Sequence, residues 1–253
     1  MSRIAIIAAM ERELAPLVRG WKRISLDCSG RAVSCFERLD SENQEMVAIA
    51  GGIGCTNAEQ AAWAVAAQYQ PEMLVSAGLA GALIRSLKVG SIVTPNVIVD
   101  AATGIEYRCA TGGGSIGGGI LVSADEVAGA EAKQKLVERF HALIVDMEAA
   151  GVARVAQQAG LGFRCVKAIS DEADFVMPPL NRFVDAEGKF QTGKFAAWAA
   201  FRPHYWAKIA ALARNSRRAT EALCDWLAKN VSSGLSAGKV VTLEGAEFSE
   251  AKN

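Results

Sequence analysis

Acidic side chains follow three apolar segments of this chain, each near the point where the segment ends. Glu13, Glu148 and Asp171 each come within a few residues of such a segment. Taken singly, each has an ordinary explanation, because a carboxylate in the first turn of a helix accepts hydrogen bonds from free backbone N–H groups and favours the helix dipole. If the three segments are strands of one sheet, however, their carboxyl ends meet at one edge and the acids line a common cleft.

A cleft lined by carboxylates suits the cleavage of a glycosidic bond. One acid protonates the leaving group, another activates the attacking water, and anionic charge stabilises an oxocarbenium-like sugar. The residues for other chemistries are poorly placed: the six cysteines never reach C-x-x-C spacing, and the two histidines, His141 and His204, are expected in structural roles. We therefore expect neither a metal nor a cofactor, and we expect the cysteines to be small buried hydrophobic residues.

Apolar runs that read as strands alternate with helical patterns along the chain. Strands are expected at 3–9, 46–50, 73–77, 91–99, 120–122, 142–145 and 163–169. Helices are expected at about 56–68, at about 125–139, from near Glu148, and over a C-terminal extension at about 194–229. This alternation predicts a single α/β domain at 1–232, with a central mixed β-sheet flanked by helices, and a flexible tail at 233–253.

The composition is that of a soluble globular protein. The chain has 253 residues, of which 51% are hydrophobic, with 27 basic and 27 acidic residues, which is enough for a large buried core. A formal net charge of zero gives no overall attraction for nucleic acid, so we expect no nucleic-acid partner. No run of eighteen apolar residues and no signal-peptide pattern is visible, so we expect a cytoplasmic protein.

Five segments resemble the signatures of the nucleoside phosphorylase superfamily, and they stand in the order of that family. They read IIAAMERE at 6–13, GIG at 52–54, GLAG at 78–81, VDMEA at 145–149 and AISDEAD at 168–174. The methylthioadenosine/S-adenosylhomocysteine nucleosidase branch is the most similar in style, over about residues 3–175. The resemblance implies an enzyme that cleaves the N-glycosidic bond of a purine nucleoside, and it implies a homodimer.

The resemblance also implies a role for each matching residue. Glu13 is expected to position and deprotonate the attacking water. Glu148 is expected to hold the ribose hydroxyls while Met147 packs on the sugar. Asp171 is expected to protonate or hydrogen-bond the N7 edge of the purine, supported by Ser170.

Other positions of the expected substrate site depart from the nucleosidase pattern. Gly78, Leu79 and Lys167 are expected at the substrate, but relatives usually have serine at Leu79 and arginine at Lys167. Lysine keeps the positive charge and lacks the planar fork of arginine. No aromatic residue stands in 124–130, where relatives place a phenylalanine against the purine. Recognition of the base is therefore expected to differ.

The acceptor of the sugar is predicted to be water. Phosphorylases of this superfamily hold phosphate with a Gly-Asp-Pro-type first loop and arginines, whereas the loop here reads Ala9-Met10-Glu11 and no arginine stands just before Gly78. A phosphate-dependent purine nucleoside phosphorylase and a non-catalytic purine-nucleoside-binding protein on the same fold remain as alternatives. A dinucleotide-binding domain is disfavoured, because Asn57 occupies the third glycine position of its fingerprint.

The C-terminal extension is a local exception to the neutral charge. Between Gly188 and Thr220 the chain has seven basic residues and no acidic one, interleaved with aromatic residues. One interpretation is an amphipathic helix packed on the sheet or in a dimer; the other is peripheral membrane contact through about 194–218. The extension and the Ser-Asp-Glu segment also resemble the hopanoid-associated branch of the superfamily, which implies a long apolar group at the 5′ position of an adenine nucleoside.

Overall fold

A computed structural model describes residues 3–39, 45–110, 116–185 and 187–230. Its strands are β1 (Arg3–Ala8), β2 (Lys22–Cys28), β3 (Arg31–Leu39), β4 (Glu45–Ala50), β5 (Met73–Ala82), β6 (Ile92–Thr94), β7 (Val97–Asp100), β8 (Glu106–Arg108), β9 (Ile116–Gly117), β10 (Ile120–Ser123), β11 (Ile144–Asp146) and β12 (Gly162–Asp171). Its helices are α1 (Glu11–Leu14), α2 (Cys55–Tyr69), α3 (Ala130–Phe140), α4 (Ala149–Ala159), α5 (Thr192–Ala200) and α6 (Trp206–Asn230), with 3₁₀ turns η1 (Leu180–Phe183) and η2 (Pro203–Tyr205).

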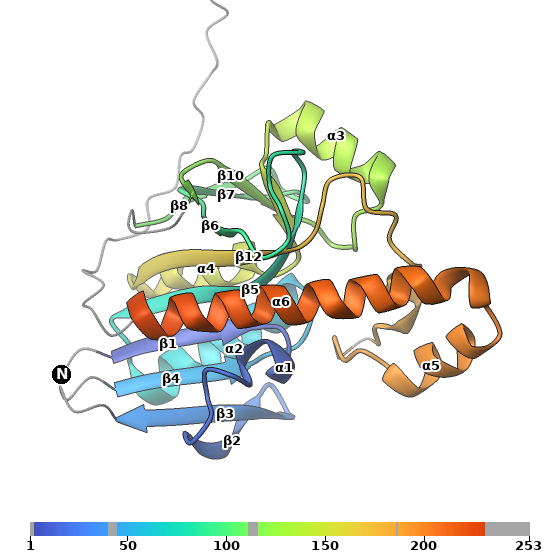
Figure 1. The fold of residues 1–253 in the computed structure, drawn as a ribbon. Coiled ribbons are helices and arrows are strands. Elements are labelled where there is room, and N and C mark those ends of the chain that lie inside the picture. The colour runs from blue at the N-terminus through green and yellow to red at the C-terminus, as the bar shows by residue number, and fades with distance from the viewer. Residues whose placement is uncertain (1–2, 40–44, 111–115, 186, 231–253) are drawn as a thin grey trace, which may run out of the picture.

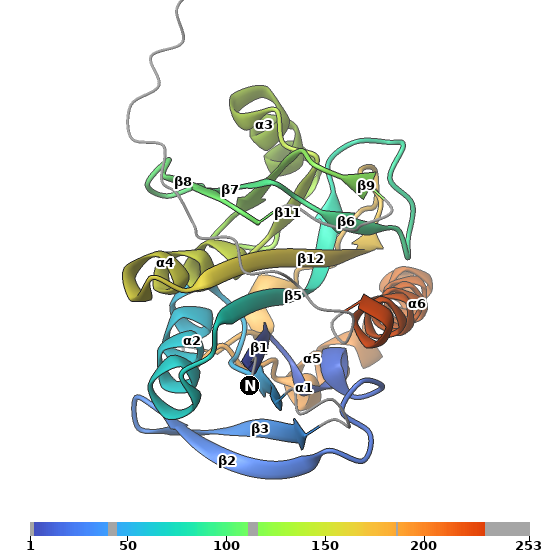
Figure 2. The same cartoon turned by 90° about the vertical axis from the view of Figure 1, so that its left-hand side faces the viewer.

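The strands of the described chain form one mixed sheet in the order β2-β3-β4-β1-β5-β11-β10-β7-β8, and β12 runs beside β5 and pairs with β6. Strands β1, β4, β5 and β12 pair in parallel, while β11 is antiparallel to β5. Helices pack on both faces of the sheet (Figures 1 and 2). The predicted α/β fold with a central mixed sheet and flanking helices is therefore confirmed.

Apolar side chains bury themselves on both faces of this sheet. One core lies under α2 and α4, where Val65 and Val152 are fully buried. The core of the opposite face includes Leu14 of α1 and Leu223 and Leu227 of α6. Removal of this apolar area from water supplies the main driving force for folding. The C-terminal half of α6 is thus part of the domain rather than an appendage.

Two of the expected elements are divided in the structure. The segment 91–99 forms two strands, β6 and β7, separated by Pro95, because proline has no N–H to give to a ladder. The expected helix at 194–229 is two helices, α5 and α6, separated by the η2 turn. Pro203 begins that turn and disfavours a helical conformation at the preceding residue.

Other differences lie at element ends. Helix α3 begins at Ala130 rather than near 125, and Val127 N–H in the preceding loop donates to the side chain of Asn181 instead. The β2–β3 hairpin was not among the expected strands.

Among the described residues, no helix combines the length and the apolar character that crossing a membrane requires. The expected tail at 233–253 lies outside the described residues, and all six cysteines are unpaired, with Cys55 the one that is only partly buried.

Candidate active site

The pairing register of β5 brings the candidate residues together. In the parallel pair with β12, Lys167 lies opposite Gly78, and Asp171 lies opposite Gly81. In the antiparallel pair with β11, Val145 also lies opposite Gly81. The end of β11 and the end of β12 therefore flank the same part of β5. A register shift just before Asp171 marks a β-bulge, a device that re-aims a side chain at the end of a strand.

Glu13 lies in α1, directly beyond the end of β1, and its side chain is 3% exposed. Its Oε2 atom has no hydrogen-bond partner among the described residues. A Cβ atom at Gly78 would lie 3.3 Å from this oxygen and 3.5 Å from Lys167 Nζ, so the bare backbone of β5 admits both groups. Burial raises the pKa of Glu13, and the charges of Lys167 and Arg12 oppose that rise. A buried carboxylate that lines a cavity is suited to bind and deprotonate a water molecule.

Lys167 is fully buried and is paired with Asp146. The Nζ atom lies 2.7 Å from Asp146 Oδ2, and the two side chains are 1% and 0% exposed. Burial opposes the charge on the lysine, yet Asp146, Cys165 and Glu148 together raise the pKa of Lys167 above its ordinary value. Asp146 also accepts hydrogen bonds from Ser123 Oγ at 2.6 Å and from Ala149 N–H at 2.9 Å. Lys167 is therefore a fixed cation at the inner end of the site.

Glu148 stands at the start of α4 and faces the same cavity. Its Oε1 accepts a hydrogen bond from Gly54 N–H at 2.9 Å. Burial and the nearby Asp146 carboxylate raise the pKa of Glu148 to about 7, although Lys167 and the Gly54 N–H favour the charged form. Met147 lines the cavity beside it. A buried carboxylate held by backbone in this way is suited to accept hydrogen bonds from two hydroxyl groups.

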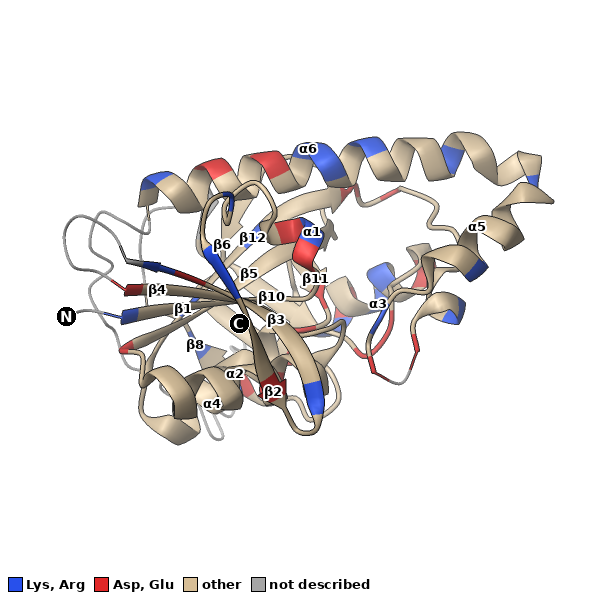
Figure 3. Cartoon of the chain, turned by 90° about the horizontal axis from the view of Figure 1, so that it is seen from below, with Lys and Arg blue, Asp and Glu red and all other residues tan. Residues whose placement is uncertain are grey.

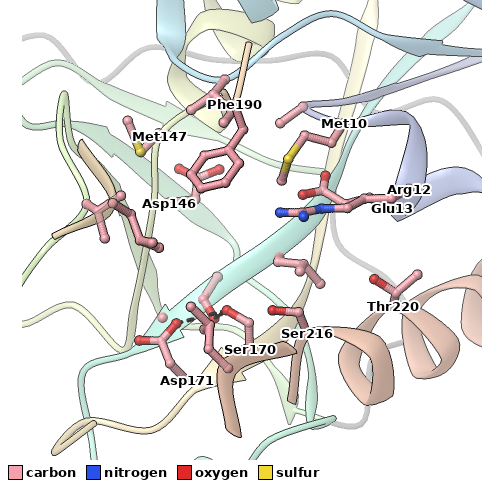
Figure 4. Close-up of a pocket in the computed structure, with 18 of the residues that line it drawn as sticks. Met10, Arg12, Glu13, Asp146, Met147, Ser170, Asp171, Phe190, Ser216 and Thr220 are labelled. Atoms are coloured by element: carbon pink, nitrogen blue, oxygen red, sulfur yellow. Dashed lines mark hydrogen bonds between the residues drawn. The ribbon is translucent and has the colours of Figure 1, made fainter. Parts of the chain in front are cut away.

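Asp171 lies at the opposite side of the cavity and is held by two donors. Ser170 Oγ is 2.8 Å from Asp171 Oδ1, as the dashed line in Figure 4 shows. The ammonium group of Lys133, from helix α3, is 2.6 Å from Asp171 Oδ2. Both side chains of this ion pair are almost fully buried. Lys133 was not among the residues expected at the site.

The side chains of Glu13, Asp146, Glu148 and Asp171 line one cavity of about 620 Å³. Figure 4 shows Glu13, Asp146, Met147, Ser170 and Asp171 around a common space. The lining of the cavity is mostly apolar. Its apolar residues include Met10, Pro16, Leu79, Met177, Leu180, Val184, Phe190, Phe195, Ile209 and Leu212, and the polar residues Arg12, Ser216, Arg217, Thr220 and Glu221 also line it.

The cavity has aromatic rings that do not come from the expected segment. Residues 124–130 lack an aromatic side chain, as the sequence shows, but Phe190 points into the cavity from the segment before α5 (Figure 4). Phe195 of α5 lines it as well, and its ring centroid is 5.4 Å from that of Phe190. Sequence reasoning missed both rings, because the segment that supplies them lies beyond the region of resemblance. Two phenylalanines at the start of the predicted C-terminal helix, Phe190 before it and Phe195 within it, were the available signal.

The structure brings the expected residues together. Glu13, Leu79, Met147, Glu148, Ser170 and Asp171 all line the cavity. Gly78 and Lys167 lie directly behind Glu13 rather than on the cavity wall. The arrangement provides a carboxylate for a water molecule, a carboxylate for hydroxyl groups, a third acid for a base edge, and an apolar space beyond.

A mixed α/β sheet with four buried carboxylates around one cavity at its strand ends defines a glycosidic-bond-cleaving type of site. The family model of the phosphorylase superfamily matches residues 3–114 and 100–197 of this chain. The chain belongs to the phosphorylase superfamily.

Individual relatives are nucleosidases. The 5′-methylthioadenosine/S-adenosylhomocysteine nucleosidase of Staphylococcus epidermidis is 30% identical over 202 residues, which cover 68% of this chain and 87% of the relative. The solved structure of the Helicobacter pylori enzyme of the same name, with butyl-thio-DADMe-Immucillin-A, has a TM-score of 0.69 at 17% identity and covers 92% of this chain and 98% of that chain. The native structure of futalosine hydrolase from H. pylori also has a TM-score of 0.69 at 17% identity, over 91% of this chain and 97% of that chain. By their names, two of these relatives are nucleosidases of 5′-methylthioadenosine and S-adenosylhomocysteine, and the third is a hydrolase of futalosine.

Proposed function

We propose that this chain hydrolyses the N-glycosidic bond of an adenine nucleoside that carries a large apolar group at its 5′ position. The observation that carries the proposal is the buried Glu13, which lines a mostly apolar cavity together with Glu148 and Asp171. The membership in the phosphorylase superfamily and the nucleosidase relatives support the same reaction class.

The reaction divides among three carboxylates. Glu13 takes a proton from a water molecule whose oxygen attacks C1′ of the sugar. The C1′–N9 bond breaks, and its electron pair passes to the purine, where N7 gains a proton at Asp171. Glu148 accepts hydrogen bonds from the ribose hydroxyls, so that its negative charge stabilises the oxocarbenium-like transition state. The products are the free base and the free sugar.

Water is the acceptor that we favour over phosphate. An anion in the acceptor position would lie against Glu13, whose carboxylate repels it while that carboxylate is ionised. The nearest buried cation, Lys167, is already paired with Asp146 at 2.7 Å. Phosphate remains the alternative acceptor, since Arg12 also lines the cavity.

The apolar lining residues support an apolar 5′ substituent. Leu79 stands on β5, and Ile209, Leu212 and Ala213 line the cavity from the first half of α6. Burial of each CH₂ group in such a space stabilises binding by about 0.8 kcal/mol. An adenosyl lipid of the hopanoid type is one ligand of this chemistry.

The experiment is to measure adenine release from 5′-methylthioadenosine, S-adenosylhomocysteine, adenosine and an adenosyl-lipid analogue, each with and without phosphate. We expect release without phosphate and the highest kcat/KM for the most apolar substituent. Strict dependence on phosphate would replace hydrolysis by phosphorolysis. No release from any of the four, combined with measurable binding, would favour a purine-nucleoside-binding protein.

The tip formed by α5 and α6 suggests peripheral contact with an anionic membrane, which we add to the proposal. Phe201 and Trp206 are 85% and 56% exposed at this tip, and basic residues follow along the outer half of α6 (Figure 3). Aromatic side chains beside Lys and Arg suit the membrane interface. Co-sedimentation with vesicles of anionic lipid should exceed that with neutral vesicles, and the double variant Phe201→Ser/Trp206→Ser should abolish the difference.

A homodimer is the assembly that the sequence resemblance implies, and we propose it for this chain. Trp63 on α2 and Ile105 are large apolar side chains that stay 40% and 42% exposed on the single chain, which is the kind of surface that a partner subunit covers. Light scattering coupled to size-exclusion chromatography should give twice the mass of one chain. A mass of one chain at micromolar concentration would refute this assembly.

A further inference from the structure

Helix α3 buries a charge instead of an apolar side chain. Within α3, all of whose residues are described, Lys133 is the single buried residue, at 3% exposure. Its ammonium group lies 2.6 Å from Asp171 Oδ2 and 3.0 Å from the carbonyl oxygen of Glu172. Lys133 is also one of the residues that line the substrate cavity. The lysine is therefore at the base end of the proposed active site.

Stability alone is a poor reason for this arrangement. Replacing a buried ion pair by well-packed apolar residues is often neutral or stabilising, because both charges lose their hydration on burial. A leucine or methionine at position 133 would cover the same part of the core without that cost. The backbone of β5 makes room for the pair, since a Cβ at Gly81 would lie 2.9 Å from Asp171 Oδ2 and 3.4 Å from Lys133 Cε.

The pair also brings a proton donor to the acid. Asp171 Oδ2 lies within hydrogen-bond distance of Lys133 Nζ and Oδ1 of Ser170 Oγ, so both oxygens of the acid are held in place. The proposed hydrolysis needs a proton at N7 of the leaving purine. The ammonium group of Lys133, which contacts Asp171 Oδ2, carries protons that can be passed on to this base edge.

We propose that Lys133 is a positioning residue that holds Asp171 at the base edge and supplies, through Asp171, the proton that N7 gains. This inference rests on the proposed function. When C1′–N9 breaks, the electron pair passes into the purine, a proton moves from Lys133 Nζ to Asp171 Oδ2, and Asp171 gives that proton to N7. The lysine is left as a neutral amine, and solvent returns its proton after the base leaves. The positive charge that leaves the lysine neutralises the negative charge that develops on the purine.

The first test compares two leaving groups. Lys133→Met keeps the length of the side chain and removes its proton, and Lys135→Met on the exposed side of α3 is the matched control. For 5′-methylthioadenosine, we expect Lys133→Met to lower kcat about a hundredfold with KM within about threefold. For a 4-nitrophenyl riboside, whose leaving group departs as an anion without a proton, kcat should stay within about threefold. Equal losses on both substrates, or no loss on either, would overturn the inference.

The second test removes the acid as well. In the background of Asp171→Asn, the further change Lys133→Met should cost less than about threefold in kcat, because the lysine acts through the aspartate. Lys133→Arg should have a kcat close to that of Lys133→Met, since it keeps the charge but its guanidinium does not give up a proton. A hundredfold loss in the Asn background would show that the lysine acts by another route and would contradict the proposal.

A binding measurement tests the pair without turnover. The N7 atom of a 9-deaza adenine nucleoside carries a hydrogen that Asp171 can accept, most strongly as a carboxylate, whereas a 7-deaza nucleoside has a C–H there. Lys133→Met should weaken calorimetric binding of the 9-deaza compound at least tenfold and that of the 7-deaza compound less than threefold. If the wild-type chain binds both but cleaves no nucleoside, the proposed function fails and this ratio still decides the role of Lys133. A wild-type chain that binds neither compound overturns the base-edge assignment of Asp171 and the inference with it.

Discussion

Lys167 and Asp146 form a fully buried ion pair, with Nζ 2.7 Å from Oδ2, at the inner end of the cavity. The two residues come from strands on either side of β5 and are 21 positions apart in the sequence. Because Lys167 also faces Glu13 across Gly78, the pair fixes one cation beside the carboxylate that we assign to the water.

Loss of one partner of this pair should be costly for stability. We expect Lys167→Met to reduce the free energy of unfolding by about 3–5 kcal/mol, because it leaves the Asp146 charge buried and unpaired. Lys135→Met, which breaks an exposed pair with Glu131, should change it by less than about 1 kcal/mol. Urea unfolding of the three proteins measures this, and equal small changes would mean that Asp146 is neutral in the folded state.

Glu13 should be required for turnover but not for binding. Glu13→Gln keeps the shape of the side chain and cannot take a proton from water, so kcat should fall by a factor of about 10²–10⁴. The dissociation constant of a substrate analogue should stay within about threefold. Glu11→Gln is the control, since Glu11 lies in the same helix on the exposed side, paired with Arg23. A variant at Glu13 with normal turnover would assign the water to another group.

Activity should fall as the pH falls below 7. The pKa of Glu148 is raised to about 7 by burial and by Asp146, so the ionised form that accepts from the ribose hydroxyls is present above pH 7 and is lost below it. Burial raises the pKa of Glu13 as well, which acts in the same direction. The value of kcat/KM should drop about tenfold per pH unit on the acid side. A flat profile from pH 8 to pH 5 would contradict these directions.

The raised pKa of Glu148 predicts that stability, unlike activity, falls as the pH rises. Folding favours the protonated form of Glu148, because its pKa in the folded state lies above the ordinary value. The substrate-free protein therefore loses stability at this site as the pH rises from 4.5 through 7. The variant Glu148→Gln should have a higher Tm than the wild type at pH 8, and the difference should vanish near pH 4.5. Thermal unfolding at both pH values measures it.

The absence of a side chain at Gly81 should matter for Asp171. A Cβ there would lie 2.9 Å from Asp171 Oδ2, closer than two unbonded atoms tolerate, so Gly81→Ala should displace the carboxylate. We expect kcat/KM to fall tenfold or more. Gly193→Ala is the control, because a Cβ at that position of α5 meets nothing within 4 Å. Similar kinetics for the two variants would show that Asp171 moves aside without consequence.

The apolar wall of α6 should set the preference for the 5′ group. Ala213 lines the cavity, whereas Ala210 on the same helix does not. Ala213→Asp places a charge against the apolar substituent, so the ratio of kcat/KM for 5′-butylthioadenosine to that for 5′-methylthioadenosine should fall about tenfold or more. Ala210→Asp should leave the ratio unchanged. A fall of equal size in both variants would place the substituent elsewhere.

Local patterns in the sequence were sufficient to predict much of the site. The alternation of apolar runs and helical patterns predicts a mixed sheet, and the acids after 3–9, 142–145 and 163–169 mark its active edge. Their convergence depends on strand order, which local patterns do not encode. It follows in the structure from the register of β5 with β11 and β12.

The division of the C-terminal extension was only partly predictable. Pro203 marks the break between α5 and α6, yet the aromatic residues of the extension fit a solvated helix, a membrane surface or a core equally well by spacing alone. Only the folded chain shows that Phe190 and Phe195 line the cavity while Phe201 and Trp206 are exposed.

The sequence by itself determined which carboxylates stand at strand ends, because a strand and the turn after it are read from neighbouring residues. Tertiary structure alone decided their partners. Lys133 has the spacing of a surface lysine in an amphipathic helix, and its burial against Asp171, 38 residues away, depends on how α3 packs against the end of β12. Two charges form an ion pair when they lie close together in space, and local sequence patterns do not determine that distance.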